Sequence, residues 1–151
     1  MFIMNILSGG FMKKASKFHN RAFPFSLLPF LLTALPAAAQ GCLDLDTALT
    51  APKTQEYSVL IAEAVGDEVQ PADVDFWKYM ESGDWSAVYA ATPMSDPGVF
   101  FFESANGNKE FKDVWGGMAE ESDRPDLLSW AEDLGAPSDL AQCFADVLIG
   151  E

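Results

Sequence analysis

Carboxylates dominate the side chains of this 151-residue chain that could carry out chemistry. There are 23 aspartate and glutamate residues, nine lysine and arginine residues, and one histidine. Two carboxylates that flank a glycosidic bond can hydrolyse it by acid–base catalysis. At this acid content close pairs arise by chance, and the pairs Asp44/Asp46 and Asp73/Asp75 indicate solvated surface charge. A carboxylate-dependent hydrolase is therefore the least supported of three functional hypotheses.

The other common catalytic and metal-binding patterns are missing from the sequence after residue 39. The only histidine, His19, precedes that point, which excludes histidine-based triads and histidine-ligated metals from the rest of the chain. No S-x-x-K pair, glycine-rich phosphate loop or complete EF-hand loop follows it. We therefore expect a non-enzymatic protein with no catalytic residue, no metal site and no cofactor.

Residues 1–39 predict a secretory signal peptide. Four basic residues precede an apolar segment from 23 to 35, and three alanines then end at Ala39. We expect cleavage between Ala39 and Gln40, and Met12 is the more usual kind of start for such a leader. The apolar segment is shorter than the ~20 residues that span a bilayer. The sequence therefore predicts no membrane span and an exported protein, periplasmic or extracellular.

The segment 40–151 is expected to form a single secreted globular domain, because its length suits one core of modest size. It retains all 23 acidic residues but only five of the nine basic ones, since four lie in the leader, so the net charge changes from −14 to −18. This charge argues against nucleic acid and anionic membranes as partners. A basic protein, a cation or simple solubility remain open explanations.

Cys42 and Cys143 are the two cysteines of the chain, and we predict that they form a disulfide. A bridge between positions so far apart would stabilise the fold by about 4 to 5 kcal/mol in the chain-entropy model. A lipid anchor on Cys42 is the alternative, because residues 39–42 (AQGC) loosely resemble a lipobox. Ala39 stands where leucine is usual, and lipidation would leave Cys143 unpaired, so we favour the disulfide.

Apolar residues recur with helical spacing in four segments, which predicts about four helices. The segments are 57–65, 74–80, 127–134 and 140–148. A glycine follows each of the first three, as is common at helix C-termini. The second segment differs from the others because it is apolar on more than one side.

Between residues 84 and 117, aromatic and β-branched residues alternate with turn-forming residues, which predicts about three antiparallel strands. We expect one turn at 96–98 (Asp-Pro-Gly) and a second around Asn106-Gly107. A three-residue loop at the second turn would set Glu103 opposite Lys109, whereas a two-residue loop would set it opposite Glu110. We favour the three-residue loop, because cross-strand charge pairs differ by roughly 0.2 to 1 kcal/mol.

These elements predict an α+β domain with a small antiparallel sheet of about three strands, packed with about four helices and closed by one disulfide. The strands carry apolar residues on both faces. Either helices cover both faces, or one aromatic face is left for a ligand or a second subunit. The candidate binding face consists of Trp85, Tyr89, Phe100, Phe101 and Phe102.

We expect this face to bind a protein partner or a second copy of the chain, so that the protein acts as an exported accessory module. The alternative is a domain that binds a saccharide or another small molecule on the same rings. Four tryptophans suit stacking on sugars, but tryptophan also fills small cores economically. Composition alone does not decide between binding and packing.

Overall fold

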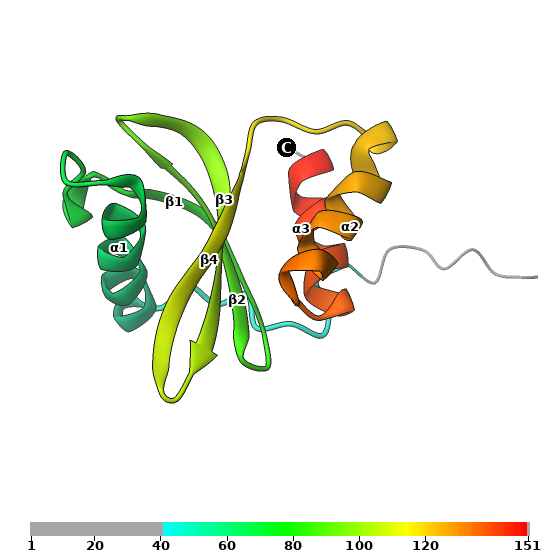
Figure 1. Cartoon of the computed structure of the whole chain (residues 1–151), viewed down its shortest axis with the longest axis horizontal. Coiled ribbons are helices and arrows are strands. Elements are labelled where there is room, and N and C mark those ends of the chain that lie inside the picture. The colour runs from blue at the N-terminus through cyan, green and yellow to red at the C-terminus, as the bar shows by residue number, and fades with distance from the viewer. Residues whose placement is uncertain (1–40, 151) are drawn as a thin grey trace, which may run out of the picture. The chain divides into compact units, whose positions relative to one another are not determined.

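The computed structural model describes residues 41–150, which belong to one compact unit, and shows a four-stranded antiparallel sheet between helices (Figure 1). The strands lie side by side in chain order: β1 (Asp75–Ser82), β2 (Trp85–Thr92), β3 (Ser95–Ala105) and β4 (Asn108–Gly116). The helices are α1 (Ala51–Val65), α2 (Arg124–Leu134) and α3 (Ser138–Ile149), with the 3-10 turns η1 (Pro71–Asp73) and η2 (Glu121–Asp123). The α+β class is confirmed. The predicted leader and its cleavage at Ala39 and Gln40 lie outside the described residues.

Helices cover both faces of the sheet. Helix α1 lies against one face, called here the α1 face, and helices α2 and α3 lie together against the other, called the α2/α3 face (Figure 1). Alternate residues of each strand point to opposite faces, and both sets contain apolar residues, so the sheet has apolar side chains on both sides. Among residues 41–150, no helix is long and apolar enough to cross a bilayer.

The core of the α2/α3 face is built on aromatic rings and the disulfide. Phe101 of β3 lies with its ring centroid 5.3 Å from that of Trp130 and 5.1 Å from that of Phe144. The predicted bridge between Cys42 and Cys143 is confirmed, with 4.8 Å between the two Cα atoms. It joins α3 to the lead-in segment, residues 41–50, that precedes α1.

The core of the α1 face is smaller and includes hydroxyl groups. Tyr57 of α1 is fully buried, with its ring 5.4 Å from that of Tyr79 and 5.3 Å from that of Phe102. Ile61, one helical turn further along α1, is also fully buried. The apolar spacing in 57–65 therefore predicted this helix and its inward face correctly.

The structure corrects the predicted numbers of elements, because residues 41–150 contain four strands and three α-helices. The difference comes from segment 74–80, which was predicted to be a helix and forms most of β1. A shift of pairing between Phe76 and Lys78 makes Trp77 the extra residue of a β-bulge. The bulge leaves Trp77 and Met80 on one face although they are three residues apart, and this spacing imitates a helix.

Two details of the predicted turns are also wrong. Residues 96–98 lie within β3, and the turn before β3 is at 93–94. Pro97 is tolerated in the strand because the pairing of β2 with β3 is irregular there. The β3–β4 loop has two residues, Asn106 and Gly107, with φ angles of 54° and 82° that suit a type I′ turn.

This shorter loop sets Glu103 opposite Glu110, which the charge argument had disfavoured. The nearby ammonium of Lys112 lies 2.8 Å from a carboxylate oxygen of Glu103 and offsets the repulsion. The geometry of the turn therefore determined the register. The ammonium of Lys112, which is not directly opposite Glu103, offsets the repulsion between the two glutamates.

Candidate functional site

The five aromatic residues of the predicted binding face do not form one exposed surface. Their exposed fractions are 8% for Trp85, 4% for Tyr89, 3% for Phe100, and 0% for Phe101 and Phe102. Three of them pack on the α2/α3 face, whereas Phe100 and Phe102 pack on the α1 face. These rings build the two cores, and Tyr89 also lines a hollow at the surface.

The exposed aromatic side chain closest to this set is Trp77 of β1, which is 42% exposed. The bulge places Trp77 on the α2/α3 side, where its ring meets that of Tyr89 at 4.9 Å between centroids and 67° between planes. The indole Nε1 donates a hydrogen bond of 3.0 Å to a carboxylate oxygen of Asp75. Because the ring is held from two directions, Trp77 is presented in a defined orientation.

Trp77 borders two hollows on the surface. The first, the Met118 hollow, has a volume of about 600 Å³ and is lined by Trp77, Tyr89, Asp96, Pro97, Gly117, Met118, Ala119 and Leu148. Most of its lining is apolar, and Met118 is 91% exposed. Volume and lining both fall within the range of small-molecule and side-chain pockets.

The second, the Leu49 hollow, has a volume of about 530 Å³ and lies between β1, the lead-in segment and α3. It is lined by Cys42, Thr47, Leu49, Trp77, Lys78, Tyr79, Met80, Asp146, Val147 and Gly150. Because Trp77 lines both hollows, we call them together the Trp77 surface. The disulfide fixes one wall of the Leu49 hollow, since Cys42 belongs to that wall.

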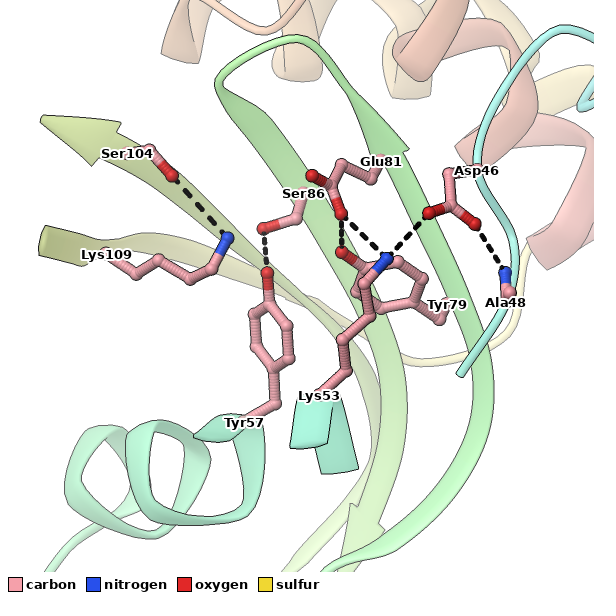
Figure 2. Close-up of polar contacts among 9 residues, drawn as sticks. All are labelled: Asp46, Ala48, Lys53, Tyr57, Tyr79, Glu81, Ser86, Ser104 and Lys109. Atoms are coloured by element: carbon pink, nitrogen blue, oxygen red, sulfur yellow. Dashed lines mark hydrogen bonds and ion pairs between the residues drawn. The ribbon is translucent and has the colours of Figure 1, made fainter. Parts of the chain in front are cut away.

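A separate polar cluster lies at the other side of β1, between the lead-in segment and α1 (Figure 2). The Nζ atom of Lys53 lies 2.8 Å from a carboxylate oxygen of Asp46 and 3.0 Å from one of Glu81, and 4.2 Å from the ring centre of Tyr79. The hydroxyl of Tyr79 donates a hydrogen bond to Glu81. Lys53 thus joins the lead-in segment and α1 to the edge strand.

Opposing effects determine the ionisation of this cluster. Burial alone would raise the pKa of Glu81, but the hydrogen bond from Tyr79 and the ammonium of Lys53 hold this pKa below its ordinary value of 4.5. Burial is also the largest cause that raises the pKa of Tyr79, and the bond to Glu81 adds to it. At neutral pH the cluster therefore consists of two carboxylates, one ammonium and a neutral phenol.

Ser86 is the residue of this region that most resembles a nucleophile. Its Oγ atom accepts a hydrogen bond of 2.6 Å from the hydroxyl of Tyr57, and Lys109 lies with Nζ 5.2 Å from the Tyr57 ring centre (Figure 2). Ser86 is only 1% exposed, so a substrate cannot reach it. Among the described residues, no buried side-chain nitrogen or oxygen lacks a hydrogen-bond partner. This satisfied cluster is typical of a structural network.

Within residues 41–150, no three histidine, cysteine, aspartate or glutamate side chains are grouped so that they could hold a metal ion. Asp46, from one of the predicted solvated pairs, is exposed and contacts Lys53. Glu121 of η2 is also exposed and accepts 2.7 and 2.9 Å hydrogen bonds from Arg124. These two carboxylates therefore position a lysine and an arginine side chain at the surface.

Trp77 was not predicted to be an exposed ring, because segment 74–80 was predicted to be a helix. A bulge has no reliable signature in a single sequence, and the available signal was the run of large side chains at 76–80, three of them aromatic.

No protein-family model, curated protein or solved structure matches this chain. The geometry of the Trp77 surface is therefore the main basis for a functional proposal.

Proposed function

We propose that the protein is an exported, non-enzymatic accessory module that binds a protein partner through the Trp77 surface. A single observation carries this proposal: a 42% exposed tryptophan stands on a bulge of an edge strand and borders two hollows. Bulges often reorient a side chain at a functional position. Tryptophan is also among the residues that contribute most to protein–protein binding energy.

The charges around Trp77 favour a partner with basic residues at the margin of its contact. Asp75 and Asp96 lie beside the ring or in the wall of the Met118 hollow, and Lys78 is the one cation in the two walls. Asp146 in the wall of the Leu49 hollow is already paired with Arg124 at 2.6 Å. Apolar residues lie between these charges. This arrangement, an apolar centre with a charged margin, is typical of protein interfaces.

The non-enzymatic part of the proposal is supported by the sequence after residue 39 and by the burial of Ser86. The sequence there contains no histidine, and the hydroxyl that most resembles a nucleophile is inaccessible. Export is supported by the leader-like residues 1–39 and by the disulfide, since disulfides persist in oxidising compartments.

Site-specific photo-crosslinking in the native host tests the proposal. A benzoylphenylalanine at position 77 should yield a discrete adduct with a second, different protein. The matched control is position 59, because Val59 on α1 is also 42% exposed but lies on the opposite side of the sheet. The absence of an adduct at position 77, or an equal adduct at position 59, would contradict the proposal.

A small-molecule or saccharide ligand is the second candidate, favoured by one observation. Trp77, Tyr89 and Asp96 line the same hollow, which combines rings for stacking with a carboxylate that can accept hydrogen bonds from hydroxyl groups. Titration of the protein with a panel of saccharides should change the tryptophan fluorescence, and Trp77→Phe should abolish the change. A response that persists in this variant would place the ligand elsewhere.

A further inference from the structure

We propose that two copies of this chain associate through their β4 edges, so that the two sheets join into one continuous antiparallel sheet around a two-fold axis at Phe111. This inference goes beyond the proposed function, because it concerns the opposite edge of the sheet from Trp77. It rests on exposure, apolar surface and the order of charges along β4.

The β4 strand is an edge strand of nine residues, and within residues 41–150 no strand pairs with its outer side. None of its residues is buried and it contains no proline. The opposite edge is different, because Asp46 pairs with Glu81 of β1 through two backbone hydrogen bonds. A long edge strand without such a cover is a ready template for pairing with another chain.

The α1 face of β4 carries apolar side chains that α1 does not cover. Phe111 is 40% exposed and Val114 is 39% exposed. Phe111 contacts the edge of the α1-face core, with its ring 5.8 Å from that of Phe102. The buried residues of that core come from α1, β1, β2 and β3 and include none from β4. A second copy at this edge would cover the exposed side chains of Phe111 and Val114 and so extend the core of the α1 face.

The order of charges around Phe111 matches an antiparallel copy of itself. The sequence from 109 to 113 is Lys-Glu-Phe-Lys-Asp. With Phe111 opposite its own copy, Glu110 lies opposite Lys112 of the other chain, and the symmetry forms this pair twice. The pairing of β3 with β4 shifts between Phe111 and Asp113, which makes Lys112 the extra residue of a β-bulge and limits the proposed regular pairing to the three pairs centred on Phe111. Both side chains belong to the α2/α3 face, since Glu110 is paired with Glu103 and the Lys112 ammonium lies 2.8 Å from the Glu103 carboxylate.

Neighbouring registers lack this complementarity. A shift of one position sets Lys109 opposite Lys112 in one direction and Glu110 opposite Asp113 in the other. A shift of two positions sets Glu110 or Lys112 opposite its own copy. Like charges directly opposite each other destabilise a sheet, so the charges select the register centred on Phe111.

Charge reversal provides the test, with sedimentation and light scattering of the oxidised protein over a dilution series at low salt. The unaltered chain should dimerise. Glu110→Lys and Lys112→Glu should each weaken the dimer by roughly 10- to 100-fold, because each variant places like charges together twice. An equimolar mixture of the two variants should dimerise again, since every pair across that interface is then opposite in charge.

Two controls separate this interface from a general effect. Lys78→Glu changes the same charge on the β1 edge and should leave the dimer unchanged. Lys112→Glu also loses the ion pair with Glu103, so the stability of this variant is measured by urea unfolding. Glu110→Lys keeps that ion pair. A chain that is monomeric at every concentration would overturn the proposal. The proposal would also be overturned if neither variant changed the dissociation constant of the dimer, or if the mixture of the two variants stayed monomeric.

Discussion

The two faces of the sheet are covered in different ways. Two helices cover the α2/α3 face, and its core consists of rings such as Phe101 and Phe144 together with the disulfide. One helix covers the α1 face, and its core includes the hydroxyls of Tyr57, Tyr79 and Ser86 as well as rings. One face is held mainly by apolar packing and a covalent bond, the other also by a polar network.

The difference shows how much sheet one helix can cover. Neighbouring strands lie about 4.8 Å apart and a helix with its side chains is about 10 Å wide, so one helix spans roughly two to three strands. Two helices suffice for four strands, and Trp115 of β4 packs on Trp130 at 5.4 Å. One helix does not suffice, which leaves Phe111 and Val114 exposed on the other side.

The largest expected effect comes from the covalent bond of the α2/α3 face. The double variant Cys42→Ala with Cys143→Ala should lose about 4 to 5 kcal/mol of unfolding free energy, because the bridge joins residues 101 apart and restricts the unfolded chain. Urea unfolding measures this loss. The unaltered protein under reducing conditions should match the double variant, and a loss below about 1 kcal/mol would contradict the chain-entropy account.

A smaller effect is expected from the polar network of the α1 face. Tyr57→Phe removes the donor of the 2.6 Å hydrogen bond to Ser86 and leaves a buried hydroxyl without it, which should cost about 1 to 3 kcal/mol in urea unfolding. Adding Ser86→Ala removes the second hydroxyl and should recover part of that loss. If the double variant is no more stable than Tyr57→Phe alone, the hydrogen bond is not the source of the effect.

The smallest expected effect is the pH dependence of the Lys53 cluster. The folded pKa of Glu81 lies below its ordinary value of 4.5, so Glu81 contributes stability above that value and loses it as the pH falls through the lower folded pKa. Glu81→Gln should therefore lower the urea midpoint at neutral pH and reduce its fall between about pH 5 and pH 3. The exposed Glu68→Gln serves as the control and should keep the slope of the unaltered protein.

The helices could be predicted from sequence because each has a clear apolar face. The spacing in 57–65, 127–134 and 140–148 gave α1, α2 and α3, and the two cysteines gave the disulfide. Segment 74–80 was misread because a single extra residue, Trp77, changed the strand alternation into a helix-like spacing. The register at Asn106-Gly107 was misjudged because one cross-strand charge pair weighs less than turn geometry.

The candidate site was less predictable than the fold. Aromatic residues on both faces of a strand indicate either two covers or one binding face, and sequence periodicity cannot tell which. Here α1, α2 and α3 bury the five predicted rings, while Trp77 is exposed by a bulge. Tyr89 lines the Met118 hollow even though it is 4% exposed, so one predicted ring does lie at the surface hollow.

The large sequence separation of the two cysteines determines when the disulfide can form. Cys42 is synthesised 101 residues before Cys143, so the ribosome completes α1 and all four strands while the first thiol has no partner. The strands follow one another through short turns, and such local pairings form quickly. The disulfide can therefore form only after Cys143 has been synthesised, when every strand of the sheet is already present in the chain.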